Sequence, residues 1–156
     1  MTSNSTKILH DAIHEAASPA GFRKKGSSWY CKEPEAILVI SPQKSQYGLK
    51  YFLNLAIFWR IFGDTIAPKE QECHLRGRIE STLPQDKRQS IERSLDFEDS
   101  TIDDITRHRA LSEAISLHAI PVLKRCATKE GLREEYKAGR LKNFLVAKIL
   151  VESISL

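Results

Sequence analysis

The segment that most constrains the fold is residues 50–59, because almost every side chain in it is apolar. Neighbouring side chains of an extended strand point to opposite faces, so two sets of residues alternate along it. The first set is Tyr51, Leu53, Leu55, Ile57 and Trp59, and the second is Phe52, Asn54, Ala56 and Phe58. A strand so apolar has either two covered faces or one core face and one functional surface. We therefore expect a central strand.

Other segments of the first half are typical of neighbouring strands. Residues 27–32 alternate large and polar groups, and residues 36–40 form an apolar run rich in β-branched side chains. Pro42 cannot donate a backbone hydrogen bond, which favours a bulge or an edge position there. Residues 73–79 alternate clearly, with Cys73, Leu75, Gly77 and Ile79 on one side. Together these segments predict an antiparallel sheet of about four or five strands.

Helical patterns lie on both sides of this predicted sheet. Apolar residues recur at helical spacing over residues 6–17, and Pro19 and Gly21 end that helix. Later helices are predicted over residues 86–95, 101–126, 129–138 and 141–153. Ser100 or Thr101 is the expected cap of the second, and Pro121 should kink or split it. The prediction is one α+β domain over residues 1–156, with an N-terminal helix, a sheet over about 22–79 and a C-terminal helical segment over about 86–153 packed on the sheet.

Composition places the chain among ordinary globular proteins, with 41% hydrophobic and 28% charged residues. The three cysteines are an odd number at wide spacing, which predicts reduced thiols and no disulfide framework. Residues 1–7 lack the apolar core of a signal peptide, and no uncharged apolar run is long enough to cross a bilayer. We expect a cytoplasmic protein that does not enter the membrane.

Several short motifs occur in an order typical of one known family. They are Gly21 to Gly26 before Trp29 and Tyr30, then Gln43-Lys44-Ser45, Asn54-Leu55-Ala56-Ile57, and Cys73-His74-Leu75-Arg76-Gly77-Arg78-Ile79. Over about residues 6–125 the chain resembles the bacterial family catalogued as domain of unknown function 4304. Ala56 stands where that family commonly has a small residue such as glycine. The resemblance implies an α+β fold and supplies no activity and no catalytic residue.

The residues most suited to metal binding or catalysis do not assemble into a site. His10 and His14 are four apart on the first helix, but they fall opposite its apolar stripe, and no third ligand is evident. Cys73 and His74 are neighbours in a strand, so their side chains point apart and cannot act as nucleophile and base. We expect no catalytic residue, no metal and no cofactor.

One strand face is cationic, because His74, Arg76 and Arg78 all alternate to the side opposite Leu75. Such a row is tolerated when it faces water, when carboxylates pair with it, or when it binds an anionic ligand or partner. Guanidinium groups suit carboxylates and phosphates, and Asn54 and Gln43 could add neutral contacts if their faces coincide. These five residues are the candidate binding site.

Charge is distributed unevenly along the chain, although its sum is only +4. Residues 1–60 carry 8 basic and 4 acidic groups, residues 61–105 carry 6 and 11, and residues 106–156 carry 10 and 5. This is a mixed surface, so nucleic-acid binding is not expected. Its best candidate is the run Arg23-Lys24-Lys25 with Trp29 and Tyr30 nearby.

Three functions remain open from the sequence. The first is a non-enzymatic protein-binding module, such as an immunity-type or accessory protein. The second is an enzyme or binder of a phosphate or carboxylate ligand that uses His74, Arg76 and Arg78. The third is a weak nucleic-acid binder. Apolar residues surround nearly the whole segment 141–153, so it inserts into the core or forms a homodimer through the C-terminal helices.

Overall fold

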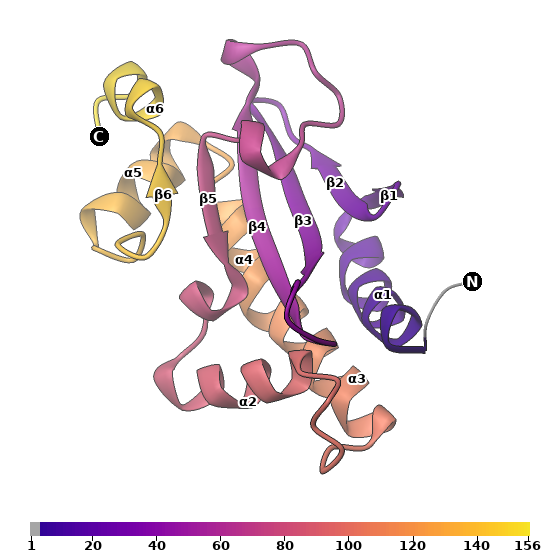
Figure 1. Ribbon diagram of the computed structural model, residues 1–156. Helices are drawn as coiled ribbons and strands as arrows, with labels where there is room; N and C mark the ends of the chain where they lie inside the picture. The colour runs from indigo at the N-terminus through magenta and orange to yellow at the C-terminus, as the bar shows by residue number, and fades with distance from the viewer. Residues whose placement is uncertain (1–3) are drawn as a thin grey trace.

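A single antiparallel sheet organises the protein. The computed structural model describes residues 4–156, and within them six strands pair in chain order (Figure 1). The strands are β1 (Arg23–Lys25), β2 (Ser28–Lys32), β3 (Ala36–Lys44), β4 (Tyr51–Trp59), β5 (Leu75–Arg78) and β6 (Leu145–Val146). The predicted α+β class is confirmed, with slightly more strands than expected.

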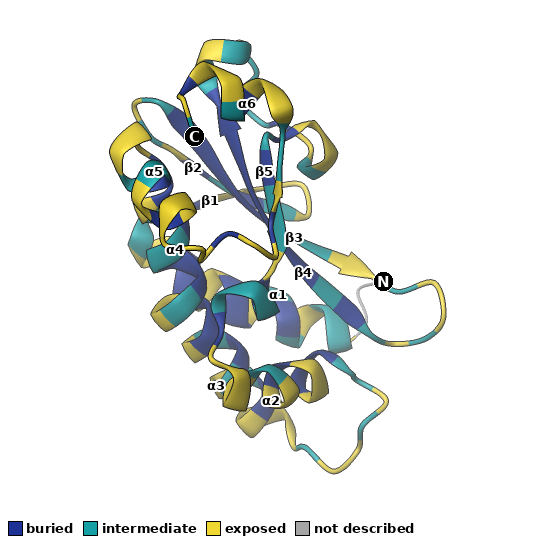
Figure 2. Ribbon diagram, turned by 90° about the vertical axis from the view of Figure 1, so that its left-hand side faces the viewer, coloured by how far each residue is buried: buried dark blue, intermediate teal, exposed yellow. Residues whose placement is uncertain are grey.

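The helices cover one face of this sheet. They are α1 (Asn4–Ala17), α2 (Gln85–Leu95), α3 (Asp104–Ala114), α4 (Ile120–Arg125), α5 (Lys129–Lys137) and α6 (Lys148–Ser153). In Figure 1, α4 lies behind the sheet and α1 beside it. Figure 2 shows the buried side of the helices turned toward the strands. The core joins Ile13 of α1 and Leu123 of α4 to Leu55 and Ile57 of β4.

The central position predicted for residues 50–59 is confirmed by the pairing of β4. It pairs with β3 from Ala36↔Trp59 to Lys44↔Tyr51, and with β5 on its other side. By contrast, β2 pairs with β3 only as far as Ile40. Pro42 therefore lies in a stretch of β3 that is an edge on one side, where a residue without an N–H is tolerated.

Two strands differ from their predicted extent. Strand β1 was not predicted; it forms a hairpin with β2 through Gly26, whose φ of +64° favours glycine. Strand β5 is shorter than residues 73–79, because Cys73 ends a 3-10 turn and Ile79 begins another (Ile79–Thr82). The expected alternation therefore holds only from Leu75 to Arg78.

The long helix predicted over 101–126 is present as three consecutive segments. Helix α3 begins at Asp104, capped by Asp103, whose carboxylate accepts the Thr106 N–H at 2.7 Å, so a cap at Ser100 or Thr101 was wrong. A π-helical segment (Ile115–Ala119) then joins α3 to α4. It ends two residues before Pro121, whose missing N–H would interrupt a regular helix.

The helix predicted over 141–153 was wrong in its first half. Residues 145–146 form β6 on the free edge of β5, and α6 begins only at Lys148. An apolar segment of this length suits a buried strand or a helix equally well, and pairing with β5 decided between them. Leu141, Phe144 and Leu150 are buried, whereas Leu145 is 63% exposed and Ile149 is 50% exposed.

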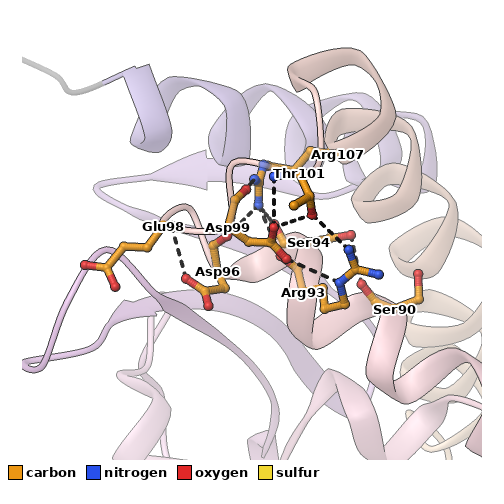
Figure 3. Close-up of polar contacts among 8 residues, drawn as sticks. All are labelled: Ser90, Arg93, Ser94, Asp96, Glu98, Asp99, Thr101 and Arg107. Carbon is orange, nitrogen blue, oxygen red and sulfur yellow. Dashed lines mark hydrogen bonds and ion pairs between the residues drawn. The ribbon is translucent and has the colours of Figure 1, made fainter.

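A buried arginine holds the connection between α2 and α3 (Figure 3). Arg107 is 3% exposed and donates hydrogen bonds of 2.8–3.2 Å to four backbone carbonyls, those of Arg93, Ser94, Asp96 and Asp99. Its guanidinium also lies over the Phe97 ring. Because a guanidinium donates in several directions in one plane, one side chain satisfies the last turn of α2 and the loop that follows.

Candidate functional site

The sheet face that the helices leave open carries the candidate residues. Paired residues of neighbouring strands share a face, so the register defines a row across all six strands described here. That row is Arg23, Tyr30, Val39, Ala56, Arg76 and Leu145. We call this side of the sheet the open face. Asn54 and Gln43 alternate onto it as well, so all the predicted neutral contacts lie on the side of Arg76 and Arg78.

The segment between β4 and β5 covers part of the open face. Its residues cross one end of the sheet in Figure 1. Cys73, at the end of this segment, packs with Ile37, Val39, Ala56 and Phe58 in a small second core. Cys73 was expected on the side of Leu75, but the strand begins after it. Burial raises the pKa of its thiol to about 12, so it stays protonated at neutral pH.

His74 is occupied by structural contacts. Its Nδ1 accepts the backbone N–H of Trp59 at 3.0 Å, which places any ring proton on Nε2. The ring packs against Phe58 and Phe62, at centroid distances of 4.7 and 4.5 Å. Burial lowers the pKa of His74, so its imidazole is neutral near pH 7. It contributes no positive charge to the strand face.

Arg76 and Arg78 have different surroundings. Arg76 forms a bidentate ion pair with Glu70, with Nε and Nη2 at 2.9 and 3.1 Å from the two carboxylate oxygens. Arg78 is exposed, has no ion pair with any described carboxylate, and stacks on Phe52 with its guanidinium carbon 3.9 Å from the ring centroid. Sequence reasoning missed the role of Phe52, although its alternation with Asn54 placed it on this face. Arg78 is therefore the available cation of this strand.

Four of the five predicted site residues surround one shallow hollow of about 220 Å³. They are Gln43, Asn54, Arg76 and Arg78, together with Glu70, Gly77 and Leu145. The Asn54 amide donates to Gln43 Oε1 at 2.9 Å, so each amide partly satisfies the other. His74 is not part of its lining. We call this the polar hollow.

A larger basic hollow of about 660 Å³ lies on the β1 side of the open face. Its lining combines the cations Arg23, Lys24, Lys25 and Lys32 with Gly21, Tyr30, Ile37 and Ile66. No acidic residue lines it, and none of the four cations forms an ion pair within residues 4–156. This basic hollow is the strongest uncompensated charge on the face.

The first-helix histidines were expected on the solvent side; His14 is exposed, whereas His10 is only partly exposed. Trp29 and Tyr30, the candidate stacking pair, lie on opposite sides of the sheet. Trp29 is 1% exposed on the helix side, where its Nε1 donates to His14 Nδ1 at 3.5 Å. His10 contacts the same indole edge-on at 5.2 Å. Tyr30 alone of the pair lies in the basic hollow. Among the described residues, no three His, Cys, Asp or Glu side chains are grouped as a metal site would require.

These features define a class of protein: an α+β protein with one helix-covered and one open sheet face, and cations on the open one. The family model described as Domain of unknown function (DUF4304) matches residues 13–125, and the chain belongs to that family. The match runs from α1 to α4, which agrees with the resemblance seen in the sequence. Neither the curated proteins nor the solved structures contain a match. Over the described residues, no helix is long and apolar enough to cross a membrane.

Proposed function

We propose that the protein is a non-enzymatic protein-binding module of the immunity or accessory type, acting in the bacterial cytoplasm. Its open face binds an acidic surface of a partner protein. The observation that carries the proposal is the basic hollow, whose four cations are uncompensated by any carboxylate of its lining. Like charges this close repel one another, and an acidic partner relieves that repulsion.

The apolar groups of the same surface support a protein as the occupant. Ile66, Tyr30 and Ile37 all line the basic hollow, and Ile66 is exposed whereas Ile37 is buried. An apolar centre with a charged rim is the usual composition of a transient protein interface. Trp29 is buried, so the hollow offers one aromatic ring, which is poor support for stacking nucleic-acid bases.

The test is affinity capture from the native bacterium, followed by mass spectrometry and measurement of binding to the purified partner. We expect Arg23→Glu/Lys32→Glu to slow association by at least about ten-fold, because charge on a rim sets the association rate. Lys129→Glu/Lys137→Glu on α5 makes the same charge change and should bind like the wild type. Equal loss in both variants, or no stoichiometric partner, contradicts the proposal.

A small-anion function is a second candidate, favoured by the polar hollow. In it, Arg78 and the Asn54–Gln43 amide pair would hold a carboxylate or phosphate, with Arg76 released from Glu70 or shared with it. Glu70→Gln should then strengthen binding of inorganic phosphate or acetate, because it frees the Arg76 fork. Unchanged binding in Glu70→Gln and in Arg78→Ala eliminates this candidate. His74 stays outside the hollow, so an acid–base role lacks support.

A homodimer through the C-terminal segment belongs to the same proposal. Leu145 lies exposed on the edge strand β6, and Ile149, in the first turn of α6, is half-exposed. An edge strand that carries an apolar residue is suited to pairing with a second copy. Light scattering over a range of concentrations measures the mass, and Leu145→Lys should convert a dimer into a monomer. A monomer at all concentrations contradicts this part.

A further inference from the structure

A third hollow, apart from the open face, gathers the basic residues of the C-terminal part. It measures about 370 Å³ and lies where the turn before α2 meets α4, α5 and the chain leading to β6. Its charged lining consists of Arg88, Arg125, Arg140, Lys142 and Glu135, with His118 of the π-helical segment beside them. It shares no lining residue with the polar or the basic hollow. We call it the C-terminal hollow.

A buried carboxylate positions two of its arginines. Glu135 is 3% exposed, and its two oxygens accept from Arg125 Nε at 2.9 Å and from Arg140 Nε and Nη2 at 2.7 and 3.1 Å. These hydrogen bonds hold the pKa of Glu135 below its ordinary value, so it remains ionised. The Glu135 carboxylate therefore holds the two guanidinium groups side by side and neutralises only one of their two positive charges. Such a pair is preorganised for a second anion.

Donors remain free on these two guanidinium groups. Arg125 uses only Nε, and Arg140 leaves one terminal nitrogen without a hydrogen bond within residues 4–156. Both side chains are more than half exposed, so these N–H groups are accessible to a ligand. Planar guanidinium forks bind phosphate oxygens with good geometry.

The remaining cations leave the hollow with excess positive charge. Arg88 is anchored through Nε to the Leu83 carbonyl at 3.2 Å, and exposed Lys142 makes no ion pair with any described residue. Four permanent cations thus face one carboxylate. Ser81 and Asn143 add neutral polar groups to the same lining. A dianion compensates this excess better than a single carboxylate would.

We propose that the C-terminal hollow binds a phosphate-bearing small molecule, with the dianionic phosphate held by Arg125, Arg140 and Lys142. The volume lies in the lower range of small-ligand sites and accommodates a phosphate group with a small organic substituent. Free phosphate and a phosphate monoester present the same group to these cations, and the experiment distinguishes them.

The experiment is calorimetric titration of the full chain at low ionic strength with inorganic phosphate, pyrophosphate and O-phosphoserine in separate arms. We expect at least one arm to bind. The tighter of the inorganic phosphate and O-phosphoserine arms identifies free phosphate or the monoester as the better ligand, and the pyrophosphate arm tests whether a second phosphate group strengthens binding. Lys142→Glu should weaken that binding at least about ten-fold, since a charged donor becomes a repelling carboxylate. Lys137→Glu, an exposed residue of α5 outside the lining, should stay within about two-fold of the wild type.

Three results would overturn the proposal: no binding in any arm at millimolar concentration, equal binding by Lys142→Glu and the wild type, or equal weakening in both variants. Thermal unfolding checks that Lys142→Glu is folded, and Arg125→Gln provides a second variant in the same hollow. Partner capture through the open face is measured independently, so the phosphate-binding proposal and the proposed function can be refuted separately.

Discussion

Replacing Arg107 by methionine removes the clamp on the α2–α3 connection and keeps most of the side chain's volume. Four backbone carbonyls lose their donor, and one of these hydrogen bonds, to Ser94, is fully buried. The other three are partly exposed to water. The methionine still packs over Phe97, so the change tests the hydrogen bonds more than the packing.

The expected loss follows from these four bonds. An unsatisfied buried carbonyl costs about 2 kcal/mol, and three carbonyls that water partly reaches lose about 2 kcal/mol together. Arg107→Met should therefore lower the free energy of unfolding by about 4 kcal/mol. For a chain of this length, that corresponds to a fall in Tm of about 8–16 °C. Arg107→Lys keeps the charge but cannot reach four carbonyls at once, and should lose about half as much.

Chemical denaturation and thermal melting of the two variants provide the measurement. Arg109→Met is the matched control, because Arg109 is exposed on the same helix and makes no ion pair with any described residue. It should stay within about 0.5 kcal/mol of the wild type. A loss below about 1 kcal/mol in Arg107→Met would refute the reasoning, since the carbonyls would then be satisfied without the guanidinium.

Gly77→Ala should cost about 1–3 kcal/mol in denaturant titration, because its added carbon would lie 2.4 Å from a ring carbon of Phe144; an unchanged midpoint would mean that the ring has room. Burial raises the pKa of Cys73 and Cys126 to about 12, so both thiols should resist iodoacetamide near pH 8 until the protein unfolds; equal labelling of the native and denatured protein would contradict this. Burial lowers the pKa of His74 below 6.5, so its contribution to stability is present above that pH and is lost as the pH falls toward the folded pKa. His74→Gln should flatten this acid-side loss, and a ring titration by NMR at or above 6.5 would exclude the mechanism.

Local periodicity predicted most of the elements. The strand at residues 51–59 was placed correctly because both of its faces are apolar, which suits only an interior position of the sheet. Helix α1 was predicted correctly because its apolar stripe and the following Pro19 are both local signals, which depend only on residues a few positions apart. Strand β6 was missed because a strand of two residues is too short to show a hydrophobic periodicity. Only its pairing with the free edge of β5 defines it.

The candidate site was predicted in part. Alternation placed Arg76 and Arg78 on one face, and the register brought Asn54 and Gln43 to the same hollow. The partners of these residues could not be predicted, because Glu70 and Phe52 reach them through loop geometry and strand pairing. Arg125, Arg140 and Lys142 of the C-terminal hollow were visible only as part of the net positive charge of residues 106–156, and Arg88 lies in the net-negative range 61–105.

The sequence by itself determined most of the longer strands and helices and which side of each is apolar, since those properties depend on neighbours a few positions away. The tertiary structure alone decided which charges are neutralised, because an ion pair such as Arg76–Glu70 depends on distances set by packing of the whole chain. It also decided that Arg78 and the basic hollow have no carboxylate partner among the described residues and that the C-terminal hollow keeps an excess of positive charge. These are the surfaces on which the proposed functions rest.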